Sequence, residues 1–367
     1  MLKVYGSKIS YYTGKLEAYL RYKGLPYERI PSFAHRPAIL ANTGAMQMPI
    51  VERDDGRWMS DTTPILRQLE TEYPEPSIFP GSPAVRFIAL LIEDYADEWL
   101  WRPAMHYRWS YAHDRELLSS IITDELTAHT PLPRFIKRRL IQRRQRGGFV
   151  RGDGVCNATW NHVEGGYLTA LSAMSRMLEK RSYLLGDSPS VADFGLMGPM
   201  LRHFGQDPTP AEIMRSQAPA VWAWTARVWN ARPPRNGASF VESVPEDATP
   251  LLAEICETHL VQLGANAEAW ARASTKKRPP RRFEMEIQGC HYRNMPVSRY
   301  RVACLEKLRQ AFSGLGEEEQ GQVRSLLDRP GAEILWGADL AVGSGFDEEG
   351  LAPFGQAINV YDKGFPR

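Results

Sequence analysis

The stretch from Met48 to Thr62 contains residue types that could bind the backbone and the charged end of a small peptide. Pro49 opens a β-prone run, where a proline either lies on a sheet edge or follows a cis bond at a tight turn. A cis bond would turn the backbone N–H and C=O of Met48 outward, where an extended peptide could pair with them. Asp61 and Thr62 stand at an expected helix start, whose free N–H groups suit a carboxylate. Since Thr62 adds a hydroxyl donor and Asp61 an anion for an ammonium group, the pair predicts a site for a zwitterionic amino-acid end.

The elements needed to position these groups alternate between strand and helix. Gly24 ends the first helical pattern as a C-cap would, and the two β runs around Asp55-Gly56 are typical of a hairpin. The expected strands cover 2–6, 27–30, 48–53 and 58–59, and the expected helices cover 13–23 and 63–73, with a loop before residue 48. This order, β-α-β-loop-β-β-α, matches the thioredoxin arrangement.

With these motifs in place, the chain resembles the glutathione transferases. That family carries Val-Pro before a hairpin and Glu-Ser-x-Ala-Ile at the next helix start, where this sequence has Met48-Pro49 and Asp-Thr-Thr-Pro-Ile at 61–65. The opening Val-Tyr-Gly-Ser-Lys-Ile-Ser-Tyr-Tyr at 4–12 is similar to the family's first strand and active-site turn. Alone, Asp61-Thr62 is more often a plain helix cap. Four fragments in the right order favour the resemblance, which covers residues 1–80 well.

The resemblance implies a site for glutathione as co-substrate. Its γ-glutamyl end would lie on Asp61 and Thr62, and its cysteinyl backbone would pair with Met48. The implied glutathione-binding residues are Met48, Pro49, Asp61, Thr62 and, for the glycyl carboxylate, Gln47 or Arg36.

A thiol reacts as its thiolate, so such an enzyme must lower the thiol pKa with a hydrogen bond or a positive field. Residues 1–80 contain no cysteine, which removes a mixed-disulfide mechanism that needs a protein thiol. Ser10 aligns best with the family's activating Ser or Cys and stands just before a helix, although it could equally be a plain turn residue. Tyr12 is the next candidate, followed by Tyr5 and Thr13.

An all-α second domain is expected over 84–245, with the resemblance reaching about residue 235. In the family, one helix of this domain lines the pocket for a hydrophobic electrophile, which makes His106, Tyr107 and Trp109 pocket candidates. Ordinary core packing is at least as frequent a reason for an aromatic helix stripe. Glu93 and Asp97, four residues apart, are interpreted as solvated charges, and Ser190 with Asp193 as a structural capping box.

Seven Lys and Arg residues fall within 134–146, a pattern that could bind nucleic acid or an anionic membrane. A solvated helix face is the favoured interpretation, because the segment holds only one aromatic residue for base stacking. If the segment lies beside the mouth of a site, it could attract anionic substrates.

Residues 246–367 form an extension for which the resemblance offers no counterpart. Helical patterns cover 251–273, 300–312 and 317–327, and a basic, proline-rich link covers 275–282. Cys290-His291 lacks further metal ligands, so packing is its expected role. The extension is therefore expected to be mainly helical or irregular. It could wrap onto the second domain, cap the pocket or extend a dimer interface.

Composition excludes several classes. The 45 Lys+Arg and 43 Asp+Glu balance to a net charge of +2, and no apolar run is long enough to span a membrane. Four scattered cysteines predict neither a disulfide scaffold nor a metal site. We expect a cytoplasmic, homodimeric glutathione transferase-like enzyme with no nucleic-acid, membrane or metal partner. Glutathione-dependent ether cleavage, dehalogenation, isomerisation, disulfide reduction and a non-catalytic assembly module remain the alternatives.

Overall fold

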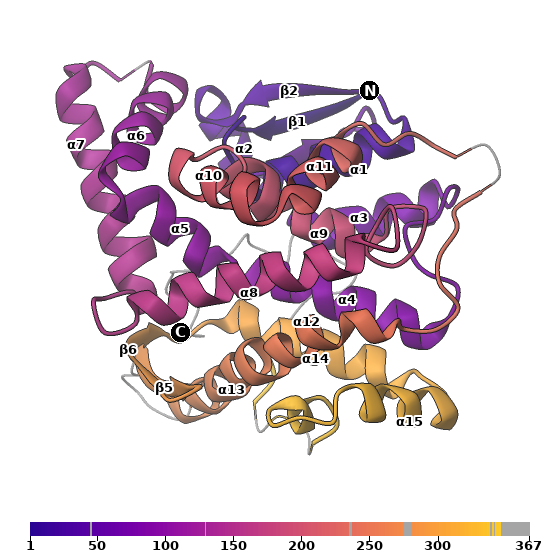
Figure 1. The fold of residues 1–367 in the computed structure, drawn as a ribbon. Helices are drawn as coiled ribbons and strands as arrows, with labels where there is room; N and C mark the ends of the chain where they lie inside the picture. The colour runs from indigo at the N-terminus through magenta and orange to yellow at the C-terminus, as the bar shows by residue number, and fades with distance from the viewer. Residues whose placement is uncertain are drawn as a thin grey trace.

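A computed structural model describes residues 1–44, 46–128, 130–234, 237–274, 281–337, 340 and 342–345. A small sheet and its helices form one end of the molecule, long helices form its middle, and the C-terminal extension covers the opposite side (Figure 1).

The N-terminal part is the expected thioredoxin-like α/β unit. Its sheet has the order β2-β1-β3-β4, in which β1 and β2 are parallel and the other pairs are antiparallel. Gly24 ends the first helix with a left-handed φ of 66°, as the sequence predicts. The elements are β1 (Leu2–Gly6), α1 (Tyr11–Lys23), β2 (Tyr27–Pro31), α2 (Arg36–Thr43), β3 (Ile50–Glu52), β4 (Trp58–Ser60) and α3 (Thr62–Glu72).

The segment before β3, expected to be a loop, contains a helix. A short 3₁₀ turn at Ser32–His35 leads into α2, where Pro37 occupies the first turn and Gly44 caps the end at φ 75°. A proline near the start and a glycine just past the end are the ordinary signals of a short helix. The segment is also rich in alanine and proline, a composition that favours a loop, and for this reason no helix is expected there from the sequence.

The middle of the molecule is all-helical, as expected. Helix α9 packs between α1 and α4. A Cβ at Gly195 would lie 2.8 Å from the backbone of Glu93, and a Cβ at Gly198 would lie 2.8 Å from the ring of Tyr11, so only glycine permits this approach. The helices are α4 (Pro83–Glu98), α5 (Trp101–Ser110), α6 (Ala112–Leu126), α7 (Arg134–Gln145), α8 (Trp160–Leu178), α9 (Val191–Pro199), α10 (Pro208–Gln217) and α11 (Pro219–Trp229).

The capping box predicted before α9 is present and has a structural role. Asp193 Oδ2 accepts from the backbone N–H of Ser190 at 2.9 Å. Its Oδ1 accepts from the N–H of Leu184 at 3.1 Å and from the indole of Trp224 at 2.9 Å. One buried carboxylate thereby ties three segments of the helical part together.

The extension is mostly helical, as expected, but it also contains a hairpin in a region where no strand is expected. Strands β5 and β6 pair antiparallel around Gln288 and Gly289, both at positive φ. Part of the basic, proline-rich link, 275–280, lies outside the described residues. Cys290 is half-buried, and the adjacent His291 ring lies 3.1 Å from Glu284 on β5. The elements are α12 (Thr249–Glu254), α13 (Val261–Ser274), β5 (Arg282–Ile287), β6 (Cys290–Pro296), α14 (Arg299–Ser313) and α15 (Glu317–Leu326).

Helices α14 and α15 pack against α4, so the extension joins the same hydrophobic core as the helical part. Among the described residues, no helix combines the length and the apolar run that crossing a membrane requires.

Candidate active site

A cavity of about 320 Å³ lies where the N-terminal unit, the helical part and the extension meet. This volume falls in the range of pockets that hold small molecules. The N-terminal unit lines it with Ser7, Ile9, Ser10, Tyr11, Tyr12, Phe33, Met46, Gln47, Met48, Pro49, Asp61 and Thr62. The helical part adds Asp97, Glu98, Trp101, Met105, Arg108, Trp109, Ile122, Leu126, Arg144, Gln145, Phe149 and His203, and the extension adds Tyr300 and Arg301.

Ser10 lies at the start of α1, where the chain leaves β1 through a tight turn. Its Oγ accepts from the backbone N–H of Thr13 at 3.3 Å, which makes Ser10 the N-cap of the helix. A hydroxyl that accepts one hydrogen bond keeps its own hydrogen to donate. Ser7, in the same turn, donates to Glu125 of α6 at 2.8 Å and so anchors the turn to the helical part.

Tyr12 also lines the cavity, but its hydroxyl has a partner inside the protein. Its Oη donates to the backbone carbonyl of Asp97 at 3.0 Å, and its ring stacks on Trp101. The other two candidates lie outside the lining of this cavity. Tyr5 donates to Glu52 at 2.5 Å, and burial together with that carboxylate raises its pKa to about 12. The buried Thr13 hydroxyl accepts from the N–H of Ser7 at 3.4 Å. Of the four candidates, Ser10 is the one best placed to donate into the cavity.

The Met48–Pro49 bond is cis, as the sequence allowed, and both residues line the cavity beside Gln47. Arg36, the other candidate for the glycyl carboxylate, is exposed at the first turn of α2 and lies outside the cavity lining.

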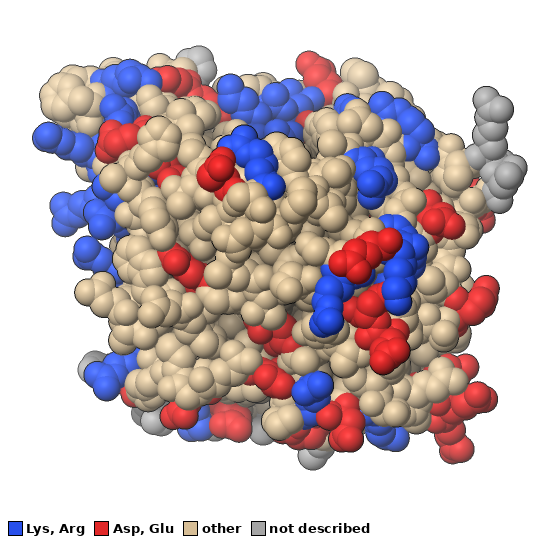
Figure 2. All heavy atoms as spheres, viewed as in Figure 1, with Lys and Arg blue, Asp and Glu red and all other residues tan. Residues whose placement is uncertain are grey.

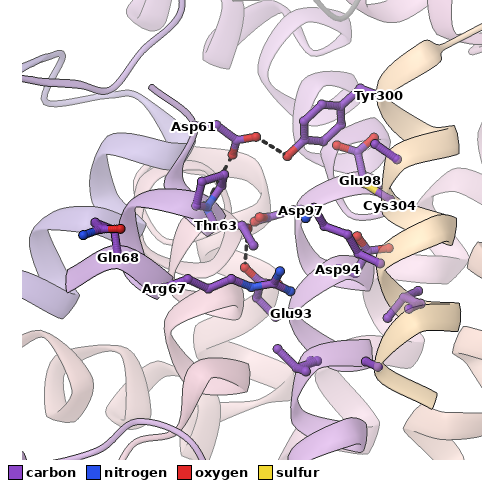
Figure 3. A pocket seen from close by; sticks show the side chains of 16 residues that line it. Asp61, Thr63, Arg67, Gln68, Glu93, Asp94, Asp97, Glu98, Tyr300 and Cys304 are labelled. Carbon is purple, nitrogen blue, oxygen red and sulfur yellow. Dashed lines mark hydrogen bonds between the residues drawn. The ribbon is translucent and has the colours of Figure 1, made fainter. Parts of the chain in front are cut away.

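Asp61 and Thr62 line the same cavity as Ser10. We call the part of the lining around Asp61 the Asp61 end and the part around Ser10 the Ser10 end. Asp61 is the N-cap of α3 at φ 71°, and its Oδ1 accepts from the N–H of Thr63 at 3.3 Å. Its Oδ2 accepts from the hydroxyl of Tyr300, on α14 of the extension, at 2.6 Å (Figure 3). Burial raises the pKa of Asp61, while the Tyr300 hydroxyl and the charge of Lys15 oppose that rise. The sequence carried no signal for Tyr300, which lies 239 residues away.

A second cavity, of about 190 Å³, adjoins this end and is lined by five carboxylates: Asp61, Glu93, Asp94, Asp97 and Glu98. The expectation that Glu93 and Asp97 are solvated is wrong, because both are buried around Lys15 of α1. The Lys15 ammonium donates to Glu93 and to Asp97, each at 2.5 Å. Burial alone would lower the Lys15 pKa, but the two carboxylates outweigh it and the pKa is raised.

Of the three aromatic pocket candidates on α5, only Trp109 lines the main cavity. His106 is fully buried and lies 3.0 Å from Glu164 on α8, and Tyr107 packs in the core against Tyr167. Helical geometry accounts for the placement of Trp109, since Trp101, Met105 and Trp109 are spaced four residues apart and so lie along one face of α5. Trp101 and Met105, earlier on the same helix, line the cavity in their place.

The basic segment forms α7, an exposed helix with no buried side chain. Lys and Arg side chains gather along the left edge of the molecule, where Figure 1 places α7, with acidic side chains beside them (Figure 2). Arg134 and Arg138 pair with Asp124 and Glu116 of α6, which supports the solvated-face interpretation. Arg144 lines the main cavity, so the helix borders the site. Within the described residues, no His, Cys, Asp and Glu side chains are grouped to hold a metal ion.

A thioredoxin-like α/β unit, a helical unit and a cavity between them define a known class of protein. Residues 4–77 match the model of the glutathione S-transferase N-terminal domain, and residues 157–227 match that of the C-terminal domain. The chain belongs to the glutathione S-transferase superfamily. No curated protein matches the chain in sequence.

Solved structures similar to this chain include two glutathione S-transferases and a beta-etherase. A glutathione S-transferase from Rhodospirillum rubrum F11 is 19% identical over 69% of this chain and 92% of its own, with a TM-score of 0.42. A beta-etherase from Sphingobium sp. strain SYK-6 is 22% identical over 63% and 96%, with a TM-score of 0.45. A glutathione S-transferase from Methylobacterium radiotolerans, in complex with glutathione sulfonate, is 17% identical over 67% and 98%, with a TM-score of 0.37. The family assignment rests on the two domain models.

Proposed function

We propose that this protein is a glutathione-dependent transferase that activates the glutathione thiol for attack on a hydrophobic electrophile. The observation that carries the proposal is the convergence of Ser10, the cis Met48–Pro49 bond and the Asp61-Thr62 pair on one cavity. In the proposed complex, the γ-glutamyl ammonium binds Asp61, its carboxylate binds the Thr62 end of α3, and the cysteinyl backbone pairs with Met48.

Ser10 would then donate its hydroxyl hydrogen to the glutathione sulfur. A donor aimed at an anion favours the thiolate over the thiol, and the first turn of α1 adds a positive field. The thiol proton leaves to solvent. The sulfur then bonds to the electrophilic carbon as the bond from that carbon to its leaving group breaks.

The apolar side of the cavity supports a hydrophobic second substrate. Trp101, Met105, Trp109, Ile122, Leu126 and Phe149 supply aliphatic and aromatic surface there. The bordering helix α7 adds positive charge, which favours the approach of anionic glutathione.

Ether cleavage, dehalogenation, isomerisation and disulfide reduction would use the same thiolate, and a panel of substrates of each class distinguishes these reactions. The homodimer and the cytoplasmic location stay predictions, and light scattering of the purified chain tests the first.

Calorimetry with glutathione, followed by titration of the thiolate absorbance of the complex, tests the proposal. Ser10→Ala should raise the pKa of the bound thiol and lower conjugation turnover about 100-fold, the usual size of losing one donor to a reacting anion. Tyr12→Phe is the matched control, because its hydroxyl already donates to Asp97, and it should leave the thiol pKa unchanged.

If the pKa of the bound thiol is unchanged in Ser10→Ala, Ser10 does not activate the thiol. A shift of that pKa in Tyr12→Phe would then assign the role to Tyr12. The absence of glutathione binding at millimolar concentration would reject the enzyme and favour a non-catalytic assembly module.

A further inference from the structure

The first turn of α14, in the extension, reaches the ammonium end of the proposed glutathione site. Tyr300 points its hydroxyl at Asp61, and the two side chains face each other across the gap between α14 and α3 (Figure 3). Tyr300 and the next residue, Arg301, both line the main cavity together with Ser10 and Met48. The extension is therefore a wall of the site as well as a neighbour of the helical part.

Contacts on both sides fix this turn in place. Arg301 is buried, and its guanidinium lies 3.3 Å from Glu98 of α4 and 3.5 Å from Asp153. Ser298 caps the helix by accepting from the N–H of Arg301 at 3.3 Å. The side chain of Asn266, on α13, bonds both the N–H and the C=O of Ser298, at 2.8 and 2.7 Å. Tyr300 thus sits on a rigid turn, as a residue that sets ligand geometry requires.

Two donors orient the Asp61 carboxylate, one on each oxygen. The N–H of Thr63 holds Oδ1 and the hydroxyl of Tyr300 holds Oδ2. Each carboxylate oxygen has a second lone pair, so both can still accept from an ammonium group. The hydrogen bond from Tyr300 also favours the ionised carboxylate, which burial disfavours.

We propose that the extension completes the glutathione site, with Tyr300 as the positioning residue that holds Asp61 oriented and ionised for the α-amino group of the γ-glutamyl residue. This inference rests on the proposed function. It assigns the extension a binding role toward the ammonium end of the ligand, separate from the thiol chemistry at Ser10.

The pH dependence of binding follows from the groups that face Asp61. The titratable groups that interact with Asp61 are Lys15 of α1, Glu93 and Glu98 of α4, and Tyr300 and Cys304 of α14. The other charged side chains that share a cavity lining with it at this end are Arg67, Asp94, Asp97, Arg301 and Lys307. An ionised Asp61 is needed to hold the ammonium, so affinity falls as the pH drops through the Asp61 pKa. Removing the Tyr300 hydroxyl takes away a contact that lowers this pKa. The loss of affinity on the acid side should then begin at a higher pH.

The test is calorimetry across an acid pH series with the full chain, its Tyr300→Phe variant and a Tyr292→Phe control. Tyr292 is a buried tyrosine of the same extension, and its hydroxyl bonds His162 at 2.7 Å, outside the cavity lining. Two ligands are compared: glutathione, and its analogue lacking the α-amino group of the γ-glutamyl residue. Tyr300→Phe should weaken glutathione binding about tenfold and should change binding of the analogue less than twofold. It should also move the acid limb, the part of the pH profile where glutathione affinity falls with decreasing pH, to higher pH.

Three outcomes overturn the inference in different ways. Equal affinity and an equal acid limb in Tyr300→Phe and the unaltered chain would remove Tyr300 from the site while glutathione binding stands. Equal weakening of both ligands would show a general structural role instead of one toward the ammonium. If the unaltered chain does not bind glutathione, the proposed function fails first and the inference with it.

Discussion

The two ends of the main cavity differ in how far along the chain their partners lie. At the Ser10 end, the N-cap bond runs to Thr13, three residues away, and the turn closes through Ser7. At the Asp61 end, the carboxylate meets Tyr300 across 239 residues. The first end is built from a local turn that many members of a fold can share. The second depends on a segment that this chain adds to the family's two domains.

The difference implies that activation of the thiol and binding of the ammonium end of glutathione depend on different parts of the chain. On the proposed function, Ser10 would polarise the thiol without a contact from the extension, whereas Asp61 accepts a hydrogen bond from Tyr300 of the extension. Predictions that disturb one end and spare the other therefore test the comparison directly.

Arg301→Met should produce the largest effect, because it removes the buried cation that holds the extension against Glu98 and Asp153. Burial raises the Glu98 pKa to about 8, and the Arg301 charge acts against that rise. Removing one partner of a buried pair costs on the order of 3–5 kcal/mol. Urea unfolding followed by circular dichroism should show a loss of that size.

Arg272→Met is the matched control for this loss, since its side chain is 63% exposed and pairs with Glu268 one helical turn away. An exposed pair of this kind contributes about 0.5 kcal/mol or less. Similar losses in the two variants would contradict the claim that buried contacts hold the extension to the cavity.

Asp61→Asn should come next in size and should act on binding alone. Asparagine caps a helix as well as aspartate and tolerates the φ of 71° at this position, so the fold of α3 is kept. The ammonium loses a charged acceptor, which predicts glutathione binding weakened about tenfold or more, read by calorimetry.

The thiol pKa of the bound glutathione should stay the same in Asp61→Asn, in contrast to Ser10→Ala. A shift in thiol pKa from the Asp61 change would show that the two ends are coupled, and the separation of binding from chemistry would fail.

The same contrast explains which features the sequence could predict. The strands of the N-terminal unit, the β3–β4 hairpin, the cap at Gly24 and the Ser190–Asp193 box all follow from signals a few residues apart, and each is present. Side-chain partners between distant helices carry no such signal. Lys15 therefore could not be assigned to Glu93 and Asp97, nor Tyr300 to Asp61, from spacing alone. The β5–β6 hairpin is a different case, because its signal is local and was overlooked. Apolar and charged residues alternate along β5, and Gly289 follows at the turn.

The smallest effect is expected at two exposed arginines, Arg36 and Arg144. Arg144 of α7 lines the main cavity, whereas Arg36 of α2 does not. A single exposed charge near a site changes the affinity for an anion only modestly, and salt screens it. Arg144→Ala should weaken glutathione binding about two- to threefold at low salt and less at high salt, and Arg36→Ala should leave it unchanged. Calorimetry at two salt concentrations measures both. A larger loss from Arg36→Ala would indicate that the glycyl carboxylate of glutathione binds at α2. The residues of the N-terminal unit that bind glutathione would then extend beyond the lining of the main cavity.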